Sequence, residues 1–279
     1  MEAPYLLVIA ATDPVATRVA ELWGTPPATG EFVDGAPIRR LSESALLLHR
    51  PGPHIHDEGL DARLPTELQR AGTTLVFPSI HRSEQNVQSL TVHPLGNPGP
   101  TADVGGRPGH LDPADPRRMA AALRRLAEGA PALGLPASYE ATHHGPALEL
   151  PACFVEIGYG AASGPPEAAV RLLADVLPDL RPDPSDRIAL AVGGGHYAPH
   201  FTDLALRRHW AFGHLLSRHA LTGLDPRAAR AAWERSGSAE GIVYARAADA
   251  ALPALQGLGP RLTDRSAPVR DASRPISGT

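Results

Sequence analysis

Histidine is the residue type whose positions in this sequence point most clearly to chemistry. The chain contains 13 histidines, and several of them directly follow short apolar runs and stand next to glycine or proline. Five such segments stand out, at residues 79–83, 91–94, 140–146, 193–199 and 211–214. Loops at the carboxyl ends of strands are where α/β sheets bind their ligands. Imidazoles on several such loops could therefore converge on one pocket.

Two of these segments carry the strongest patterns. His143 and His144 stand side by side before a Gly-Pro turn, and neighbouring side chains on an extended chain point in opposite directions. We therefore expect one of the two histidines to face a pocket and the other to brace the loop. Three glycines, Gly193 to Gly195, precede His196. They form either a tight turn after a strand or a backbone cradle for an anionic oxygen, as in an oxyanion hole.

Two carboxylates stand in unusual places. Glu140 and Glu156 lie within apolar runs that are expected to be strands, and burying an unpaired carboxylate is costly. Each therefore needs a partner such as an arginine, a histidine or a metal ion, which makes both glutamates candidates for a site. His54 and His56 lie in a loop rich in proline and glycine. They could bind a metal incidentally, and we give them little weight.

Composition excludes several kinds of protein. All 26 basic residues are arginine, so chemistry that needs a lysine, such as a Schiff base or a phosphate-loop lysine, is excluded. The net charge of −4 indicates that a nucleic acid would have to be held by a local patch. Arginines 117–118 with 124–125, or 207–208, could form one, or they could belong to solvated helix faces. The single cysteine, Cys153, excludes a disulfide framework and a cysteine-rich zinc module.

The N-terminal residues lack the features of a signal peptide, and no apolar stretch approaches the length of a membrane span. We therefore expect a cytoplasmic protein with no membrane partner.

Short β-rich runs alternate with helical segments along the chain. We expect strands at residues 5–10, 44–49, 73–77, 89–93, 138–142, 153–157, 187–192 and 241–245, and helices at 14–22, 113–128, 166–177, 226–235 and 247–255. Asp13 and Asp112 are the expected caps of the first two helices. This alternation predicts an α/β fold: one domain over residues 1–263, with a central mixed, largely parallel sheet flanked by helices. Residues 264–279 are predicted to be a mobile tail.

The same histidine segments resemble those of the archaeal and plant type of D-aminoacyl-tRNA deacylase. The resemblance rests on His81, on Thr91-Val92-His93 and on a glycine-rich stretch at 96–106. It continues through Tyr139-Glu140-Ala141-Thr142-His143-His144-Gly145-Pro146, Phe154-Val155-Glu156-Ile157-Gly158, Gly193-Gly194-Gly195-His196-Tyr197-Ala198-Pro199 and Ala211-Phe212-Gly213-His214. It covers about residues 75–220. Ala147 stands where the family usually has threonine, a departure that bears on the shape of the pocket.

The resemblance implies an enzyme that hydrolyses the ester between a D-amino acid and the terminal adenosine of tRNA. It also implies a fold similar to phosphorylases and peptidyl-tRNA hydrolases, and zinc as the cofactor. The partner is the acceptor end of D-aminoacyl-tRNA, and no stable protein partner is inferred. The expected catalytic residues are Glu140, His143, His144, His196 and His214. The expected substrate-binding residues are Gly193, Gly194, Gly195, Tyr197 and Asn97, and the expected metal ligands are His81, His93 and His144.

Other mechanisms and functions fit the same residues. Zinc would lower the pKa of a bound water to about 7, but one histidine could equally activate water without a metal while the glycine loop stabilises the oxyanion. The imidazoles would also suit another carbonyl hydrolase, such as an exopeptidase or a nucleosidase-like enzyme. A protein that binds tRNA or metal without catalysis is the third possibility.

Overall fold

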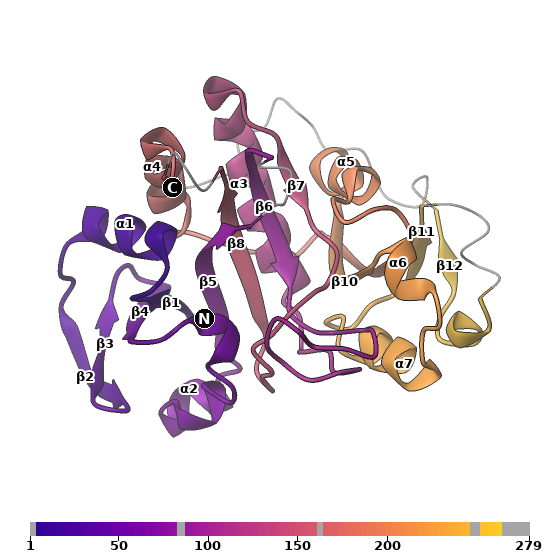
Figure 1. The fold of residues 1–279 in the computed structure, drawn as a ribbon, viewed down its shortest axis with the longest axis horizontal. Helices are drawn as coiled ribbons and strands as arrows, with labels where there is room; N and C mark the ends of the chain where they lie inside the picture. The colour runs from indigo at the N-terminus through magenta and orange to yellow at the C-terminus, as the bar shows by residue number, and fades with distance from the viewer. Residues whose placement is uncertain (1–3, 83–86, 161–163, 246–251, 264–279) are drawn as a thin grey trace.

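Two β-sheets organise the chain in the computed structural model, which describes residues 4–82, 87–160, 164–245 and 252–263 (Figure 1). The larger sheet has eight strands in the order β2-β3-β4-β1-β5-β8-β6-β7. They are β1 (Tyr5–Ala10), β2 (Ala28–Val33), β3 (Ala36–Arg40), β4 (Ala45–Arg50), β5 (Thr74–His81), β6 (Ser89–Pro94), β7 (Ala137–Tyr139) and β8 (Ala152–Gly158). The smaller sheet has four strands in the order β10-β9-β11-β12. They are β9 (Arg187–Val192), β10 (Trp210–Leu216), β11 (Gly241–Tyr244) and β12 (Arg261–Leu262).

Helices and short helical turns connect the strands. The α-helices are α1 (Pro14–Trp23), α2 (Thr66–Arg70), α3 (Pro116–Leu133), α4 (Glu167–Val176), α5 (Pro199–Arg207), α6 (Arg218–Leu221) and α7 (Pro226–Glu234). The 3₁₀ turns are η1 (His54–His56), η2 (Asp61–Arg63) and η4 (Pro253–Leu255). Within the described ranges, no helix is both long and apolar enough to cross a membrane.

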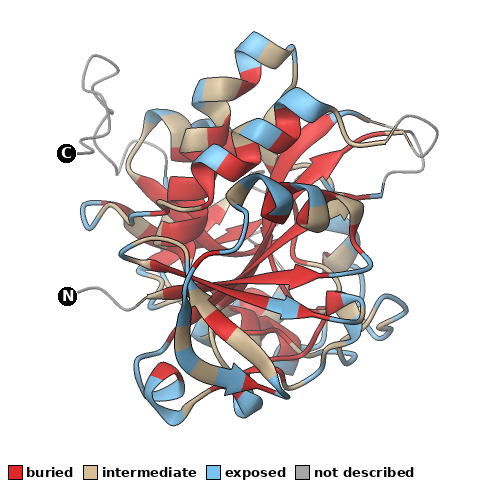
Figure 2. Cartoon of the chain, turned by 90° about the vertical axis from the view of Figure 1, so that its left-hand side faces the viewer, coloured by how far each residue is buried: buried red, intermediate tan, exposed pale blue. Residues whose placement is uncertain are grey.

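The centre of the large sheet is buried on both faces. Strands β4, β1, β5 and β8 run parallel to one another, and all six residues of β1 are buried. Successive side chains of a strand point to opposite faces, so Tyr5, Leu7 and Ile9 pack under helices α1, α3 and α4. Leu6 and Val8 instead meet leucines from the 60–68 segment. Figure 2 shows these buried strands enclosed by helices with exposed outer faces. The carboxyl ends of four parallel strands therefore meet at one edge.

An irregular segment after β7 forms hydrogen bonds with the strands of the small sheet. Directly after β7, Thr142 N donates to Leu215 O at 2.9 Å, and Leu215 N donates to Thr142 Oγ1 at 3.0 Å. Ala141 N also donates to His196 O at 2.8 Å. These hydrogen bonds carry the segment that starts at Glu140 from the large sheet onto the strands of the small one.

Most predicted elements are confirmed, including the α/β class and the mixed, largely parallel sheet. The second, smaller sheet formed by β9 to β12 was not predicted. The strand predicted at 138–142 ends at Tyr139, and the hairpin of β2 and β3 and strand β10 were not predicted. The one-domain boundary stays a prediction. Residues 264–279 and most of the helix predicted at 247–255 lie outside the described residues.

The predicted cap of helix α3 is wrong. The helix begins at Pro116, and Asp115 accepts from Arg118 N at 3.2 Å. Asp112 is buried and accepts instead from Leu148 N at 3.0 Å. Both aspartates precede a proline, so this signature alone could not distinguish them.

Three arginines of α3 form hydrogen bonds and an ion pair with groups inside the protein. Arg124 is buried and forms a bidentate pair with Asp186, at 2.6 and 2.9 Å, and it also donates to Ala205 O and Trp210 O. Arg118 is buried and donates to Leu180 O, while Arg117 donates to Asp186 O. These side chains do not form the surface patch considered for phosphate binding.

We predict that Asp186→Ala lowers the free energy of unfolding by about 3–5 kcal/mol, because it leaves the buried Arg124 guanidinium without its counter-charge. Urea unfolding measures the change. Asp203→Ala is the matched control, since its partner Arg207 is 77% exposed and an exposed pair contributes at most about 1 kcal/mol. Equal losses in the two variants would contradict this assignment.

Candidate functional site

A cavity of about 400 Å³ lies at the carboxyl ends of the parallel strands. His81 enters it from the end of β5, and Glu156 from β8. His143, His144 and His196 line the same space from the irregular segments that follow β7 and β9. Five residues singled out from the sequence thus meet in one cavity, as the rule for α/β sheets predicts.

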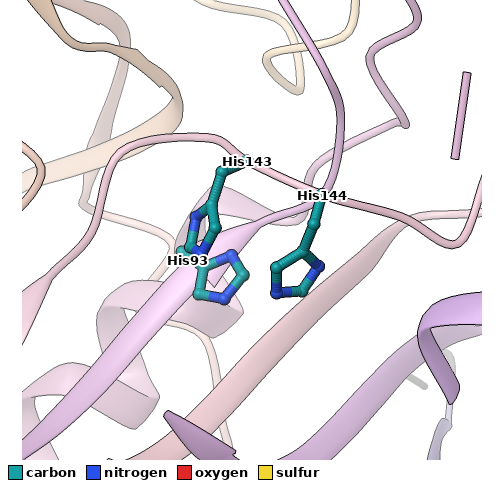
Figure 3. Close-up of side chains that lie close together, drawn as sticks. All are labelled: His93, His143 and His144. Carbon is teal, nitrogen blue, oxygen red and sulfur yellow. The ribbon is translucent and has the colours of Figure 1, made fainter. Parts of the chain in front are cut away.

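Three imidazoles converge at one side of this cavity (Figure 3). The ring centroids of His93 and His143 are 4.1 Å apart, those of His93 and His144 4.9 Å, and those of His143 and His144 4.4 Å. One nitrogen of each ring lies within 4.8 Å of the others. His93 is fixed from behind by Phe154, whose ring stacks on it at 5.2 Å.

The expectation that His143 and His144 face opposite ways is wrong. It assumed an extended chain, but His144 has a φ of +45°. This is the left-handed backbone conformation, which residues other than glycine rarely adopt. This turn brings both rings to the same side, as Figure 3 shows. The backbone is held there because His144 O accepts from Gly96 N at 2.8 Å, and His144 Nδ1 lies 2.8 Å from Gly145 O.

Glu156 is a buried charge between two histidines. Its carboxylate lies 3.4 Å from His81 Nδ1 and 3.6 Å from His93 Nε2. Burial raises the pKa of Glu156, but hydrogen bonds from His81 and His93 outweigh it and hold that pKa well below its usual range. Burial conversely lowers the pKa of His81 and His93, and the hydrogen bonds and negative charge of Glu156 raise it above its ordinary value. The partner demanded by this strand carboxylate is therefore a pair of histidines.

Glu140 is more completely enclosed. Its side chain is fully buried, and its oxygens lie 3.2 Å from His81 Nδ1 and 3.3 Å from His196 Nε2. No group within the described part of the chain makes a geometrically sound hydrogen bond to either oxygen. His81, Glu140 and His196 form a second set of possible metal-binding atoms. An orphaned buried carboxylate beside imidazoles needs a cation.

His143 and His144 have the opposite electrostatic surroundings. Burial lowers the pKa of His143 well below its ordinary value, and the nearby His93, His144 and His196 lower it further. Burial and His93 lower the pKa of His144 to about 4. Both rings are therefore neutral near pH 7, which is the form of histidine that binds metals.

Three carboxylates hold the chain that follows these histidines. Four successive backbone N–H groups, at residues 147–150, donate to them: Ala147 N to Glu58 at 2.7 Å, Leu148 N to Asp112 at 3.0 Å, and Glu149 N and Leu150 N to Asp61 at 2.6 and 2.8 Å. The segment forms no regular secondary structure. Its amide groups are nevertheless paired, as buried backbone requires.

A family model described as D-aminoacyl-tRNA deacylase matches residues 69–251. The chain belongs to this family. It is 32% identical over 243 residues to the D-aminoacyl-tRNA deacylase of Thermoplasma acidophilum, covering 87% of this chain and 90% of that relative. It is 38% identical over 194 residues to the D-aminoacyl-tRNA deacylase of Methanoculleus marisnigri, covering 69% of this chain and 42% of that relative.

A solved structure shares the fold of this family member. A conserved protein of unknown function superposes with a TM-score of 0.76 at 26% identity, covering 88% of this chain and 87% of the other. A purine nucleoside phosphorylase from Toxoplasma gondii reaches a TM-score of only 0.34 at 12% identity, covering 63% of this chain and 89% of the other. The likeness to phosphorylases stays a prediction.

Some residues expected from the resemblance to D-aminoacyl-tRNA deacylases lie outside the cavity wall. His214 is fully buried, lies 3.1 Å from Thr142 Oγ1 and 2.9 Å from Asp112 O, and so braces the segment before the histidine pair. Asn97 donates to Gly105 O at 2.9 Å within its own loop. Neither residue is among those that line the cavity.

The glycine triplet serves as a turn in the structure. Gly193 and Gly194 have φ values of +99° and +84°, which favour glycine. Gly193 N donates to Leu216 O at 2.8 Å, so its amide is not available to a ligand. None of the described cavity-lining residues is Gly193, Gly194 or Gly195. The turn delivers His196 to the cavity and Tyr197 to His81, whose Nε2 lies 3.1 Å from the tyrosine hydroxyl.

Sequence reasoning undervalued one group in the cavity wall. His54 is buried beside Asp13 and Ser79, and all three line the cavity. The sequence pattern predicts Asp13 only as the cap of α1, and places His54 only in a loop rich in proline and glycine. A usable signal was their position, since both follow apolar runs that form the parallel strands β1 and β4.

We predict that Asp112→Asn becomes more stable relative to wild type as the pH rises from 4 to 8. Burial raises the pKa of Asp112 from 3.8 to about 6, so its stabilising contribution is full below pH 3.8 and is lost as the pH rises through 6. Hydrogen bonding to Asp112 raises the pKa of His110. The stability that this interaction contributes to the wild type is also lost as the pH rises. Urea unfolding should show a relative gain of about 2–3 kcal/mol. A difference that does not change with pH would refute this account.

Proposed function

We propose that this chain hydrolyses the ester bond of D-aminoacyl-tRNA, releasing the free D-amino acid and tRNA. The observation that carries the proposal is the cavity lined by His81, His143, His144, His196 and the buried Glu156, with the buried Glu140 carboxylate directly behind His81 and His196. Membership of the D-aminoacyl-tRNA deacylase family supports it. An aminoacyl ester needs an activated water and a stabilised oxyanion, and imidazoles with carboxylates are groups that supply proton transfer at neutral pH.

We further propose zinc as the cofactor, held by His93, His143 and His144. The donor set fits, because three imidazole nitrogens converge within 4.8 Å, two of these rings are neutral, and the buried His93 Nε2 has only the long 3.6 Å contact with Glu156 and no closer partner among the described residues. This ligand set replaces His81 with His143, because His81 faces Glu140, Glu156 and Tyr197. Zinc bound there would polarise the ester carbonyl and lower the pKa of a coordinated water.

His196 is the proposed proton acceptor. It is 45% exposed, while its Nε2 lies 3.3 Å from the buried Glu140 carboxylate, so a negative charge stands beside the ring that takes the proton. In the reaction, the oxygen of water bonds to the ester carbonyl carbon and its proton passes to His196. The bond to the ribose oxygen then breaks, and the same proton passes to that oxygen. Glu140 acts here as the orienting group.

His81 and Glu156 form an ion pair in the cavity wall. His81 lies next to Glu140, Glu156 and the Tyr197 hydroxyl, and the backbones of Tyr197 and Glu140 pair in an isolated antiparallel bridge. Tyr197 is proposed to contact the substrate. A cytoplasmic location and the lack of a stable protein partner stay predictions.

We predict that the protein deacylates D-tyrosyl-tRNA and leaves L-tyrosyl-tRNA intact, and that chelator treatment abolishes the activity until zinc is returned. Release of tyrosine is measured with labelled substrates. Full activity in metal-stripped enzyme would exclude the zinc mechanism and favour the metal-free version. Cleavage of peptides without deacylation would instead favour another carbonyl hydrolase.

We predict that His93→Ala lowers bound zinc to less than a tenth of the wild-type content, because it removes one of three ligands. Metal content is measured by mass spectrometry after dialysis. His219→Ala, on the exposed surface of α6, is the matched control and should retain the wild-type content. His196→Ala should retain zinc but lose deacylation by about a hundredfold or more.

A further inference from the structure

The cavity has a second end whose residues take no part in the proton transfers proposed above. It is formed by residues at the carboxyl ends of β1, β4 and β5, together with a loop that follows β6. Its polar side chains are Thr12, Asp13, His54, Ser79 and Arg82. Ile55, Ile80 and Val104 give it apolar surface. The imidazoles of His143 and His196 lie at the other end of the same space.

The polar groups of this second end form one directed network. Asp13 accepts from Val15 N and Ala16 N through Oδ1, and from Ser79 Oγ at 2.9 Å and Ile80 N at 3.0 Å through Oδ2. His54 Nε2 faces two oxygens, Ser79 Oγ at 3.2 Å and Asp13 Oδ2 at 3.5 Å, and a proton on this nitrogen serves both of them. His54 therefore carries its proton on Nε2, and its Nδ1 is an acceptor.

This network excludes a hydrolytic triad. In a Ser-His-Asp triad the carboxylate bonds to one imidazole nitrogen and the serine donates to the other. Here Ser79 donates to the carboxylate, and Asp13 lies 3.5 Å from the same nitrogen that faces the serine. His54 Nδ1 has no hydrogen-bond partner among the residues that the structure describes. The arrangement is suited to binding and not to nucleophilic attack.

The charges of this end select the chemistry of its ligand. Asp13 is a buried carboxylate, and hydrogen bonding from His54 and backbone amides outweighs burial and lowers its pKa, so the inner wall repels anions. Asp13 also accepts hydrogen bonds from the backbone N–H groups at the start of α1, where a phosphate could otherwise bind. The unpaired acceptor of His54 and the apolar side chains favour a neutral, partly apolar group that donates hydrogen bonds. A nucleoside, with its amine and hydroxyl groups, has this character.

A cation stands at the exposed edge of the same end. Arg82 is exposed and lines the cavity, and none of the ion pairs found among the described residues involves it. Arginine binds phosphate oxygens through paired N–H groups. A nucleoside within this end of the cavity and a phosphate at Arg82 would together match the terminal nucleotide of a nucleic acid.

We propose that this end of the cavity binds the terminal adenosine of the tRNA acceptor end, and that Arg82 contacts its 5′ phosphate. The proposal rests on the proposed deacylase function, which supplies the tRNA. It orients the substrate, since the ester then lies toward His196 and Glu140. The volume of about 400 Å³ lies within the range of small-ligand sites.

The phosphate contact is tested by calorimetry with adenosine 5′-monophosphate and adenosine on the wild-type holoenzyme. The nucleotide should bind at least fivefold more tightly than the nucleoside. Arg82→Ala should abolish that difference, Arg82→Lys should retain part of it, and the remote Arg230→Ala should leave it unchanged. A difference that survives in Arg82→Ala would overturn the role of Arg82, and failure of both ligands to bind would overturn the whole site.

The alternative occupant of this end is the side chain of the substrate's amino acid. It is tested with Ile55→Trp, which fills the apolar part of this end, called the apolar slot below. If a nucleoside binds there, kcat/KM for D-tyrosyl-tRNA and D-alanyl-tRNA should fall by the same factor, of about tenfold or more. A much larger fall for D-tyrosyl-tRNA would assign the slot to the amino acid and overturn the proposal. Ile55→Val is the control variant, and thermal unfolding of both variants confirms that each of them folds.

These outcomes separate the site from the function. If wild-type protein binds the nucleotide through Arg82 but deacylates neither tRNA, the proposed function fails and the nucleotide site stands. If it deacylates both tRNAs but binds no nucleotide, the proposed function stands and the nucleotide site fails.

Discussion

Glu140 and Glu156 place two carboxylates in the interior, with exposed side-chain fractions of 0% and 3%. Removing such charges from water costs several kcal/mol each unless partners surround them. The partners are imidazoles, and they come from separate stretches of chain: His81 from β5, His93 from β6 and His196 from the turn after β9. The charge of two glutamates can therefore be accommodated only when both sheets and the segment between them are in place.

The segment between the sheets meets this requirement without regular structure. Residues 141–150 donate and accept hydrogen bonds with strand ends, with neighbouring loops and with the carboxylates of Glu58, Asp61 and Asp112. A helix would satisfy these backbone groups internally and a strand would pair them with a neighbouring strand, but neither would bring two adjacent histidines to one side. The cavity thus depends on acidic residues that act by holding the backbone of this segment.

The cavity combines two environments in one space. One end gathers neutral and charged imidazoles, as ester hydrolysis and metal binding require. The other end gathers Asp13, Ser79 and His54 in a network whose donors are already used. Asp13 and His54 lie outside the 69–251 span of the family match. The first half of the large sheet therefore shapes the site as well as supporting it.

Local pattern was enough to locate the strands, most of the helices and the histidines of the site. Apolar runs such as residues 5–10 and 187–192 predict strands because full burial demands continuous hydrophobicity. Glu140 and Glu156 could be recognised as site residues because a carboxylate within such a run needs a partner. The boundaries were weaker: two aspartates near the start of α3 carry the same capping signature, and only the packed helix distinguishes Asp115 from Asp112.

What the sequence determined by itself was the kind of chemistry, since a chain without lysine and with clustered histidines leaves proton transfer and metal binding to imidazole and carboxylate. Only the tertiary structure decided which residues share a role. It turned His143 and His144 to the same side through a left-handed residue, withdrew His214 into the interior and brought His54 to the cavity. Those outcomes depend on contacts between residues far apart in the chain, which local spacing does not encode.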